Sequence, residues 1–509
     1  MKFTTDYLKH DDRLYRHIAP QPLDNPKLGL LNHALIKKLG LGALNDSEWT
    51  DVISGRLEPL AKLTPHGLQP IAMAYAGHQF GQWAGQLGDG RGLLIAQLQD
   101  DDGKLTDLHL KGAGRTPYSR HGDGRAMIAS TVRELLGGHA LNHLGVPSSD
   151  AIGFVVSDTQ IRREYFERSA ALLRVSDCHV RLGHFEWVAM YAPDYFTDFV
   201  HKIAQSYYPT LCDNDTTDVA ALLSAIARNT AQMIVCWQLV GFSHGVMNTD
   251  NLNITGTTLD FGPYGFMEGF HPAWINNHSD HTGRYTYQNQ PMIGHWNLAT
   301  VFRKFGQLVS QSEIDNALND YENTLTDSYY RGLLGKLGFV IPDDKPLDDT
   351  DDRLHLAFEF LEILQQHKLD YTNGFRALIA VVNGDQNLEN TDKNHAHEYK
   401  LLSQFTLSLL PHAHHHQWHE WQQRYLSCLV KNVQSKADTI AQLQHANPVY
   451  ILRNHMAQKA IDLALMDDFS EVKRLFELLK NPYQSNPIST ANDTRMALSD
   501  EQVAVSCMS

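Results

Sequence analysis

The segment HGVMNTDN, residues 244–251, places a histidine, an aspartate and an asparagine close together in the chain. A second segment, TLDFGP, follows, and its Asp260 lies nine residues after Asn251. Asparagine and aspartate oxygens on two neighbouring loops suit Mg²⁺, a hard cation that also binds phosphates. We therefore expect Asn251 and Asp260 to hold the metal ion. Asp250 is the only carboxylate of the first segment, which makes it the candidate base.

These two segments resemble the catalytic loop and the metal-binding turn of protein kinases. The spacing from His244 to Asn251 matches, and so does the Asp-Phe-Gly sequence that starts at Asp260. One position departs from the pattern, because Val246 stands where a kinase carries its aspartate base. The aspartate comes four residues later, at Asp250. The match is compatible with a damaged kinase, with chance, or with a site rearranged for other phosphate chemistry.

A glycine-rich segment earlier in the chain could bind phosphate. It reads GQLGDGRG, residues 85–92, and runs directly into a strand-like segment. Glycines allow backbone N–H groups to approach phosphate oxygens closely, and Arg91 adds a positive charge. A plain hairpin turn would account for the same letters, because glycine is common in turns.

Lys111 ends the strand-like segment LTDLHLK, where its ammonium group could reach phosphate oxygens if a carboxylate held it. Glu134 lies 23 residues later in a predicted helix and is the candidate carboxylate. Two solvated surface charges are the alternative for an isolated pair of this kind. The position of the pair between the glycine segment and the later aspartates favours a shared site.

Further phosphate ligands are two arginines and one turn. Arg174 and Arg181 lie seven residues apart in LLRVSDCHVRLGHFE, and both could face a cleft and bind a terminal phosphate with their forked N–H donors. Asp123 and Gly124 form a predicted turn in RHGDGRA that could touch a nucleotide. Without the other motifs, both features would be ordinary surface positions.

The composition is that of a globular protein with 509 residues, 42% apolar and 20% charged, and a net charge of −15. This acidic balance argues against non-specific nucleic-acid binding, which needs a basic face. The five cysteines are far apart, so neither a disulfide framework nor a structural zinc site is expected. No apolar run reaches the ~18 residues that span a bilayer. We expect a cytoplasmic monomer that binds neither membrane nor nucleic acid.

The order of predicted elements is a β-containing part followed by a helical part. Strands are predicted in RGLLIAQLQD, LTDLHLKG, AIGFVVSD, ALLRVSD and HFEWVAMYA, and a helix in ASTVRELLGGHALNHLG. Helical periodicity dominates after about residue 190, and the last 25 residues resemble a loosely held tail. The expected fold is α+β with the two lobes of a protein kinase. Its predicted parts are an N-terminal extension (1–70), a nucleotide-binding lobe (71–190), a catalytic lobe (191–345) and a helical C-terminal region (346–509).

Taken together, seven blocks between about residues 70 and 480 resemble the selenoprotein O family, kinase-fold proteins that act as protein adenylyltransferases. Their order along the chain also matches, which makes the resemblance specific. The blocks are YAGHQFGQWAGQLGDGRG, LHLKGAGRTPYSRHGDGRA, RVSDCHVRLGHFE, GFSHGVMNTDN, TLDFGPYGFM, NHSDHTGRYTYQNQP and YILRNHMAQKAI.

This resemblance implies that ATP binds in the reverse direction to that of ordinary kinases, with its α-phosphate facing the acceptor. It assigns the base to Asp250 and the ligands of Mg²⁺ or Mn²⁺ to Asn251 and Asp260. The implied reaction transfers AMP to Ser, Thr or Tyr hydroxyls of proteins, including the enzyme itself; UMP transfer with Mn²⁺ is a related possibility. The implied nucleotide-binding residues are Gly88, Gly90, Arg91, Lys111 with Glu134, Asp123, Gly124, Arg174, Arg181 and Asp260.

One departure concerns cysteine. Many members of the family carry a cysteine or selenocysteine near the C-terminus, and Cys507 could occupy that place. Some relatives carry a second cysteine immediately before the NHSD block, where this chain has Asn276. The resemblance therefore does not carry over a disulfide of that kind, and Cys507 could act alone or with another thiol.

Two other readings stay open at this point. An orthodox kinase would transfer the γ-phosphate, with Asp250 as its base. A pseudokinase scaffold would bind ATP without turnover, which Val246 favours and the intact metal ligands disfavour.

Overall fold

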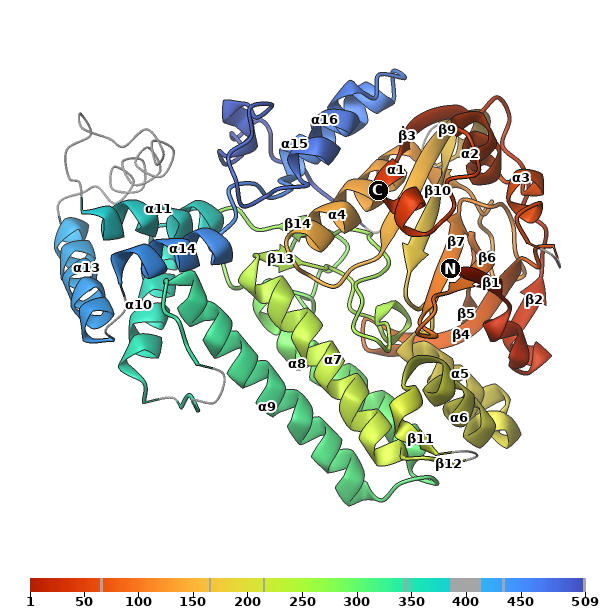
Figure 1. The fold of residues 1–509 in the computed structure, drawn as a ribbon, viewed down its shortest axis with the longest axis horizontal. Coiled ribbons are helices and arrows are strands. Elements are labelled where there is room, and N and C mark those ends of the chain that lie inside the picture. The colour runs from red at the N-terminus through yellow and green to blue at the C-terminus, as the bar shows by residue number, and fades with distance from the viewer. Residues whose placement is uncertain are drawn as a thin grey trace.

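The computed structural model describes residues 1–64, 67–163, 166–213, 216–342, 346–348, 350–384, 413–432 and 435–506. Within these residues the chain combines one large antiparallel sheet with many helices, which confirms the predicted α+β class (Figure 1). Cys507 lies outside the described residues.

The large sheet has ten strands in the described part of the chain. Its main path runs in the order β2-β4-β6-β7-β10-β9-β3. Outside this path, β1 pairs with β6, β5 with β4, and β8 with β10. The strands are β1 Lys2–Thr4, β2 Tyr15–His17, β3 Lys27–Leu31, β4 Ile71–Gln79, β5 Gln82–Gly88, β6 Gly92–Gln99, β7 Leu105–Lys111, β8 Ala126–Met127, β9 Asp150–Arg162 and β10 Phe166–Ser176.

Alternate residues of the sheet face two different cores, as the two-residue period of a strand requires. On β10, Ala171 and Leu173 pack into one hydrophobic cluster, whereas Ala170 and Leu172 pack into another. The first cluster includes Trp49 of α2, and helix α4 packs against β9 and β10 on the second side. The helices of this part are α1 His33–Lys38, α2 Asp46–Ser54, α3 Glu58–Ala61 and α4 Ile128–His143.

A group of helices follows the sheet. The segment HFEWVAMYA was predicted to be a strand, but it forms helix α5 together with the preceding residues. The prediction was wrong because α5 is apolar on nearly every side and buried between elements, so its pattern shows no helical stripe. The helices are α5 Leu182–Tyr191, α6 Phe196–Tyr207, α7 Val219–Leu239, α8 Gln290–Phe302 and α9 Gln311–Lys336. Two short strand pairs lie among them. They are β11 Cys212–Asp213 with β12 Thr216–Thr217, and β13 Phe242–Ser243 with β14 Gly265–Phe266.

Helix α7 is long and apolar enough to cross a membrane by length and composition, contrary to the expectation from the sequence. The core helix of a soluble protein passes the same test, and half of the apolar window of α7 is buried inside the protein. The helix packs along α9 and also against α8 (Figure 1).

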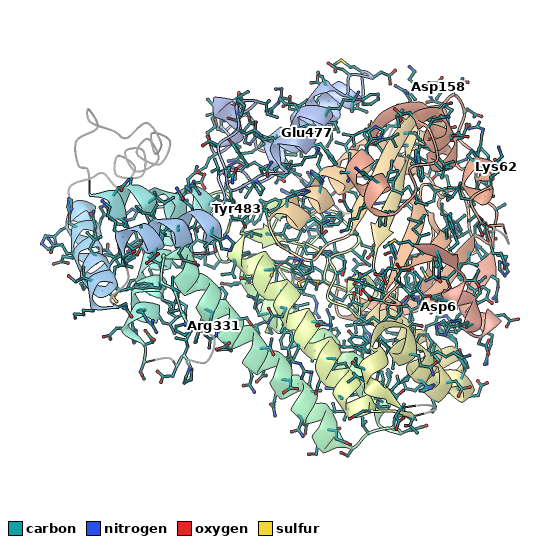
Figure 2. The ribbon with its side chains drawn as sticks, in the orientation of Figure 1. Asp6, Lys62, Asp158, Arg331, Glu477 and Tyr483 are labelled. Carbon is teal, nitrogen blue, oxygen red and sulfur yellow. The ribbon has the colours of Figure 1, made fainter. Side chains whose placement is uncertain are left out.

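The C-terminal helices divide into two groups. Helices α10 Asp352–Gln366, α11 Tyr371–Asn383, α13 Ala413–Lys431 and α14 Lys436–Ala446 surround a hydrophobic cluster of their own. Helices α15 Asn454–Ala464 and α16 Ser470–Leu478 instead pack against α4. Beyond α16, Tyr483 donates a hydrogen bond to the carbonyl of Leu144, just after α4 (Figure 2).

The segment after residue 485 was predicted to be a loose tail, and its described part is not. Asp493 is buried and forms an ion pair with Arg474 of α16. Val505 is also buried, and its carbonyl accepts a hydrogen bond from the backbone N–H of His278 at 2.8 Å. The composition of this segment is polar, but a few buried contacts hold it against the molecule.

Candidate active site

The predicted phosphate and metal ligands come together in one cleft of about 620 Å³. Its walls come from the sheet, from the turn between β5 and β6, and from the loops that contain residues 246–251 and 260–263. Every predicted site residue lines this cleft except Glu134, which lies behind it. The predicted residues that line it are Gly88, Gly90, Arg91, Lys111, Asp123, Gly124, Arg174, Arg181, Asp250, Asn251 and Asp260.

The glycine-rich segment forms both a tight turn and a wall of the cleft. Gly88 has φ +151°, and a Cβ atom there would lie 2.4 Å from the ring of Tyr118. Between the glycines, Asp89 is buried and accepts a hydrogen bond from the backbone N–H of Met73 at 3.0 Å. This anchor to β4 was not predicted, although Asp89 lies inside the glycine segment. Arg91 is exposed, and its guanidinium has no hydrogen-bond or ion-pair partner within the described chain.

Glu134 of α4 lies behind the cleft and binds two cations, Lys111 and Arg174. Only its contact with Lys111 was predicted. It forms an ion pair with Lys111, and it accepts a hydrogen bond from Nε of Arg174 at 2.7 Å. Burial alone would raise the pKa of Glu134, but Arg174 and Lys111 lower it to about 2. Burial lowers the pKa of Lys111 to about 8, against the opposing effect of Glu134. Lys111 and Arg174 are thus oriented toward the cleft by a carboxylate that stays ionised.

Asp260 links the same row of cations to the predicted metal site. Its carboxylate pairs with Nη1 of Arg174 at 3.1 Å and with Nε of Arg181 at 3.0 Å. Burial opposes ionisation here too, yet the two arginines hold the pKa of Asp260 well below its usual range. The residue adopts φ +61°, a left-handed conformation that is uncommon for a residue other than glycine. Such strained positions are common where a side chain must be aimed into a site.

His244 stabilises the backbone just before Asp260. It is buried, and its Nε2 forms a hydrogen bond of 2.8 Å with the carbonyl of Leu259, the residue before Asp260. The imidazole stacks on the indole of Trp237 from α7. Burial lowers the pKa of His244, so the neutral ring donates its Nε2–H to this carbonyl.

Asp250, the predicted base, lines the same cleft and lies in a short 3₁₀ turn, Thr249–Asn251. Its Oδ2 accepts a hydrogen bond from the side-chain amide of Gln79 at 3.0 Å, while its Oδ1 is buried and has no hydrogen-bond partner. Burial raises the pKa of Asp250 to about 6, and the Gln79 hydrogen bond partly opposes this. A carboxylate that lines a cleft and has a raised pKa has the properties of a general base.

Asn251 and Asp260 are suited to a divalent cation. The side-chain nitrogen of Asn251 donates to the carbonyl of Val246 at 3.1 Å, which leaves its oxygen as the available ligand. Among the described residues, no cluster of three or more His, Cys, Asp or Glu side chains could hold a metal by itself. Two oxygen ligands plus phosphate oxygens and water are the usual environment of Mg²⁺ at nucleotide sites.

A triad that was not predicted, with buried Glu186 and Thr249 and half-buried His78, positions the turn that contains Asp250. Glu186 of α5 accepts a hydrogen bond from Oγ1 of Thr249 at 2.5 Å and lies 2.6 Å from Nδ1 of His78 on β4. The backbone N–H of His78 in turn donates to Thr249 at 2.8 Å. Nothing in the local sequence signals this triad, because its members come from three distant segments.

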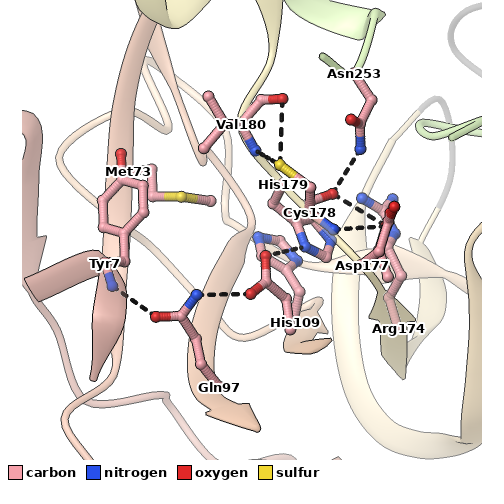
Figure 3. A network of polar contacts seen from close by, with 12 residues as sticks. Tyr7, Met73, Gln97, His109, Arg174, Asp177, Cys178, His179, Val180 and Asn253 are labelled. Atoms are coloured by element: carbon pink, nitrogen blue, oxygen red, sulfur yellow. Dashed lines mark hydrogen bonds and ion pairs between the residues drawn. The ribbon is translucent and has the colours of Figure 1, made fainter. Parts of the chain in front are cut away.

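A second buried network lies behind the glycine turn (Figure 3). Gln97 donates to Asp107 at 2.8 Å, and Asp107 lies 3.0 Å from Nδ1 of His179. The His179 ring stacks on that of His109, whose Nε2 is 3.4 Å from the carboxylate of Asp89. Burial raises the pKa of Asp107 to about 7 and lowers that of His179 well below its usual range. The network supports the wall of the cleft that carries the glycine turn.

Asp123 and Gly124 form the predicted turn at the edge of the cleft. Asp123 binds the guanidinium of Arg163 through both oxygens, at 2.7 and 3.1 Å. Gly124 has φ +72°, and a Cβ atom there would lie 2.0 Å from the carbonyl oxygen of Gly114. Glycine is therefore required at this position, and the turn brings Arg163 to the cleft as a further cation that was not predicted.

One cleft thus contains several cations held by carboxylates, together with the Asp250 carboxylate and the Asn251 amide. Such a combination is typical of transferases that act on nucleotides. The chain belongs to the SelO family, because the family model described as "Protein adenylyltransferase SelO" matches residues 1–480. The protein is therefore a nucleotidyltransferase that acts on proteins.

Similar proteins carry the same class of name. "Protein nucleotidyltransferase YdiU" of Vibrio parahaemolyticus is 39% identical over 96% of this chain and 94% of its own length. The proteins of the same description from Aliivibrio salmonicida and Erwinia tasmaniensis are each 38% identical over 96% of this chain, and over 94% and 95% of their own lengths. The similarity thus extends over almost the whole chain.

Proposed function

We propose that this enzyme transfers AMP from ATP to Ser, Thr or Tyr hydroxyls of proteins, itself included. The observation that carries the proposal is the position of Asp250. It lies in the same cleft as the phosphate-binding cations, while Val246 occupies the place of the usual kinase base. In the same cleft, Lys111, Arg174 and Arg181 supply more positive charge than transfer of a terminal phosphate alone requires.

We also propose that the walls of the cleft belong to two kinase-like lobes, residues 71–190 and 191–345. The first lobe contains strands β4 to β10 of the sheet, the glycine turn and α4. The second contains α7 and both loops of the metal site. Residues 1–70 add strands β1, β2 and β3 to the sheet of the first lobe, and residues 346–509 form the helical C-terminal region. The location of the cleft, lined by side chains from both segments, supports this division.

In the proposed reaction, an oxygen of the acceptor hydroxyl attacks the α-phosphorus of ATP. The bond between this phosphorus and the oxygen that bridges to the β-phosphate breaks, and pyrophosphate leaves. Asp250 takes the hydroxyl proton on Oδ2, because its Oδ1 is buried against Gly77. Lys111, Arg91, Arg174 and Arg181 bind the triphosphate and stabilise the charge that develops on it. Asn251 and Asp260 would hold Mg²⁺, which neutralises phosphate charge and polarises the reacting group.

Labelled ATP tests this proposal against a kinase reaction. Protein from a bacterial lysate is incubated with the enzyme, Mg²⁺ and either α-³²P-ATP or γ-³²P-ATP. We expect protein to become labelled from α-³²P-ATP only, and we expect Asp250→Ala and Asp260→Ala to lose the label. Labelling from γ-³²P-ATP alone would identify a kinase, and ATP-dependent thermal stabilisation without any labelling would identify a scaffold.

A further inference from the structure

The tip of the β4–β5 hairpin lies beside the proposed base. Gln79, at the end of β4, binds the Asp250 carboxylate, and the backbone N–H of Phe80 donates to Oδ1 of Asn248 at 3.1 Å. Gln79 and Phe80 line the cleft together with Asp250. Because Gln79 contacts the Asp250 carboxylate directly, a protein hydroxyl that reaches Asp250 also lies close to this hairpin tip.

Large apolar side chains surround this approach and are open to solvent. Phe80 is 38% exposed, Trp83 39%, Tyr191 44% and Met292 60%. Phe80 and Trp83 come from the hairpin, Tyr191 from the end of α5 and Met292 from the start of α8. Exposed apolar residues are ordinary when scattered, but contiguous ones mark interaction surfaces.

Ring contacts and helical spacing link several of these residues. The rings of Trp83 and His78 are 5.2 Å apart, and the His78 ring is 5.7 Å from Trp296. Met292 is one helical turn before Trp296 on α8, so the two side chains share one face. A Cβ atom on Gly85 would lie within 4.0 Å of both Tyr191 and Trp83, so these two side chains flank the same glycine. We call Phe80, Trp83, Tyr191, Met292 and Trp296 the apolar strip.

A cation borders the apolar strip. The guanidinium of Arg284 lies 4.5 Å from the centre of the Trp296 ring, and it would lie 3.0 Å from a Cβ atom on Gly81 at the hairpin tip. Within the described chain, Nε and Nη2 of Arg284 are buried without a hydrogen-bond partner, and no carboxylate forms an ion pair with the side chain. A carboxylate on a bound partner would supply the missing charge.

The hairpin also offers backbone groups. Among the described strands, β5 pairs only with β4, so its other edge is unpaired. Extended segments of partner proteins bind to such edges through main-chain hydrogen bonds, while neighbouring pockets select their side chains.

We propose that the apolar strip and Arg284 bind an extended segment of the acceptor protein next to the modified hydroxyl. This segment carries a large apolar residue that packs on Trp83 and Met292, and an acidic residue that pairs with Arg284. The inference rests on the proposed function, because it assumes that the hydroxyl is activated at Asp250. It adds the local sequence by which the enzyme selects its acceptors.

An array of short synthetic peptides tests the inference. Each peptide has one central Ser, Thr or Tyr and varied flanks, and the label is α-³²P-ATP. We expect peptides with both an apolar and an acidic flanking residue to be labelled best. Trp83→Ala and Met292→Ser should lower kcat/KM for these peptides about tenfold, as truncation of an anchoring contact does. Arg284→Gln should remove the preference for the acidic residue.

Two controls separate binding of the acceptor from other effects. Met466→Ser replaces a methionine that is 71% exposed beyond the end of α15 and should leave the peptide preference unchanged. The affinity for ATP, measured by calorimetry, should be equal in all four variants and the wild type, because none of these side chains is a proposed phosphate ligand.

The possible failures are distinguishable. If lysate proteins become labelled but the peptides do not, or if Trp83→Ala and Met292→Ser keep the wild-type preference, the inference is overturned and the proposed function stands. If sedimentation shows a dimer that Met292→Ser dissociates, a second copy of the chain covers the strip, and the inference is also overturned. If neither lysate nor peptides take up α-label, the proposed function fails and the inference fails with it.

Discussion

At the scale of single residues, Gly77 shows how tightly Asp250, the proposed base, is enclosed. A Cβ atom at this position on β4 would lie 2.7 Å from Oδ1 of Asp250. No real Cβ atom approaches an oxygen so closely, so any larger residue must displace the carboxylate or the strand. The carboxylate is held from its other side by Gln79, which leaves it little room to move.

We therefore expect Gly77→Ala to lower kcat for AMP transfer by at least about tenfold, because small displacements of reacting groups are costly. The affinity for ATP should change little, since Gly77 is not among the residues that line the cleft. Steady-state kinetics and calorimetry measure both. The matched control is Gly42→Ala, where a Cβ atom would have nothing within 4 Å. Equal kcat for the two variants would contradict the described position of the base.

At the scale of secondary-structure elements, Lys336 joins α9 to the segment after α14. It is buried, and its Nζ donates to the side-chain oxygen of Asn447 at 2.9 Å, while the Asn447 amide donates back to the Lys336 carbonyl at 2.9 Å. Its ammonium group lies 4.5 Å from the centre of the Phe375 ring on α11. Burial lowers the pKa of Lys336 from 10.5 to about 7.

This shift makes stability depend on pH. Between about pH 7 and pH 10.5 the unfolded chain binds more protons at this lysine than the folded protein, so the wild type gains stability from it as pH rises. Lys336→Met lacks that gain. The difference in melting temperature between Lys336→Met and the wild type should therefore shift further in favour of the wild type as the pH rises from 7 to 10. The exposed Lys473→Met serves as the control and should show no such trend. A constant difference between Lys336→Met and the wild type would contradict the lowered pKa.

The sequence predicted many of the helices and strands and most of the residues that line the cleft, but not the contacts that hold these residues in place. Helix α4 and the strands β6, β7, β9 and β10 were predicted, because their apolar patterns have clear periods and ends. Helix α5 was mistaken for a strand, since a helix buried on all sides shows no such period. The Glu186–Thr249–His78 triad could not be predicted, because only folding brings these distant residues together.

At the scale of the whole molecule, the C-terminal segment reaches the loops of the active site. Val505 pairs with Asn277 and His278, and the side chain of Asn277 donates to the carbonyl of Gly245 at 2.9 Å. The neighbouring Asn276 donates to the carbonyl of Pro263 at 2.6 Å. Val505 thus supports residues 276–278, which contact both the loop that contains Asp250 and the loop that contains Asp260.

Val505→Asp would place a charge in a buried position and should release this segment. We expect faster hydrogen exchange in residues 276–285 and a severalfold lower rate of AMP transfer, because the supported loops become less ordered. The neighbouring Ala504 is exposed, so Ala504→Asp is the matched control and should behave like the wild type. Unchanged exchange in Val505→Asp would contradict the described docking of the C-terminal segment.

The most direct test of the central claim is the intact mass of the protein after incubation with ATP and Mg²⁺. This measurement needs no known substrate, because the enzyme is proposed to modify its own hydroxyl groups. The proposed mechanism predicts a mass increase equal to one or more AMP units in the wild type and none in Asp250→Ala. An increase equal to a phosphate group, or the same AMP increase in Asp250→Ala, would contradict it.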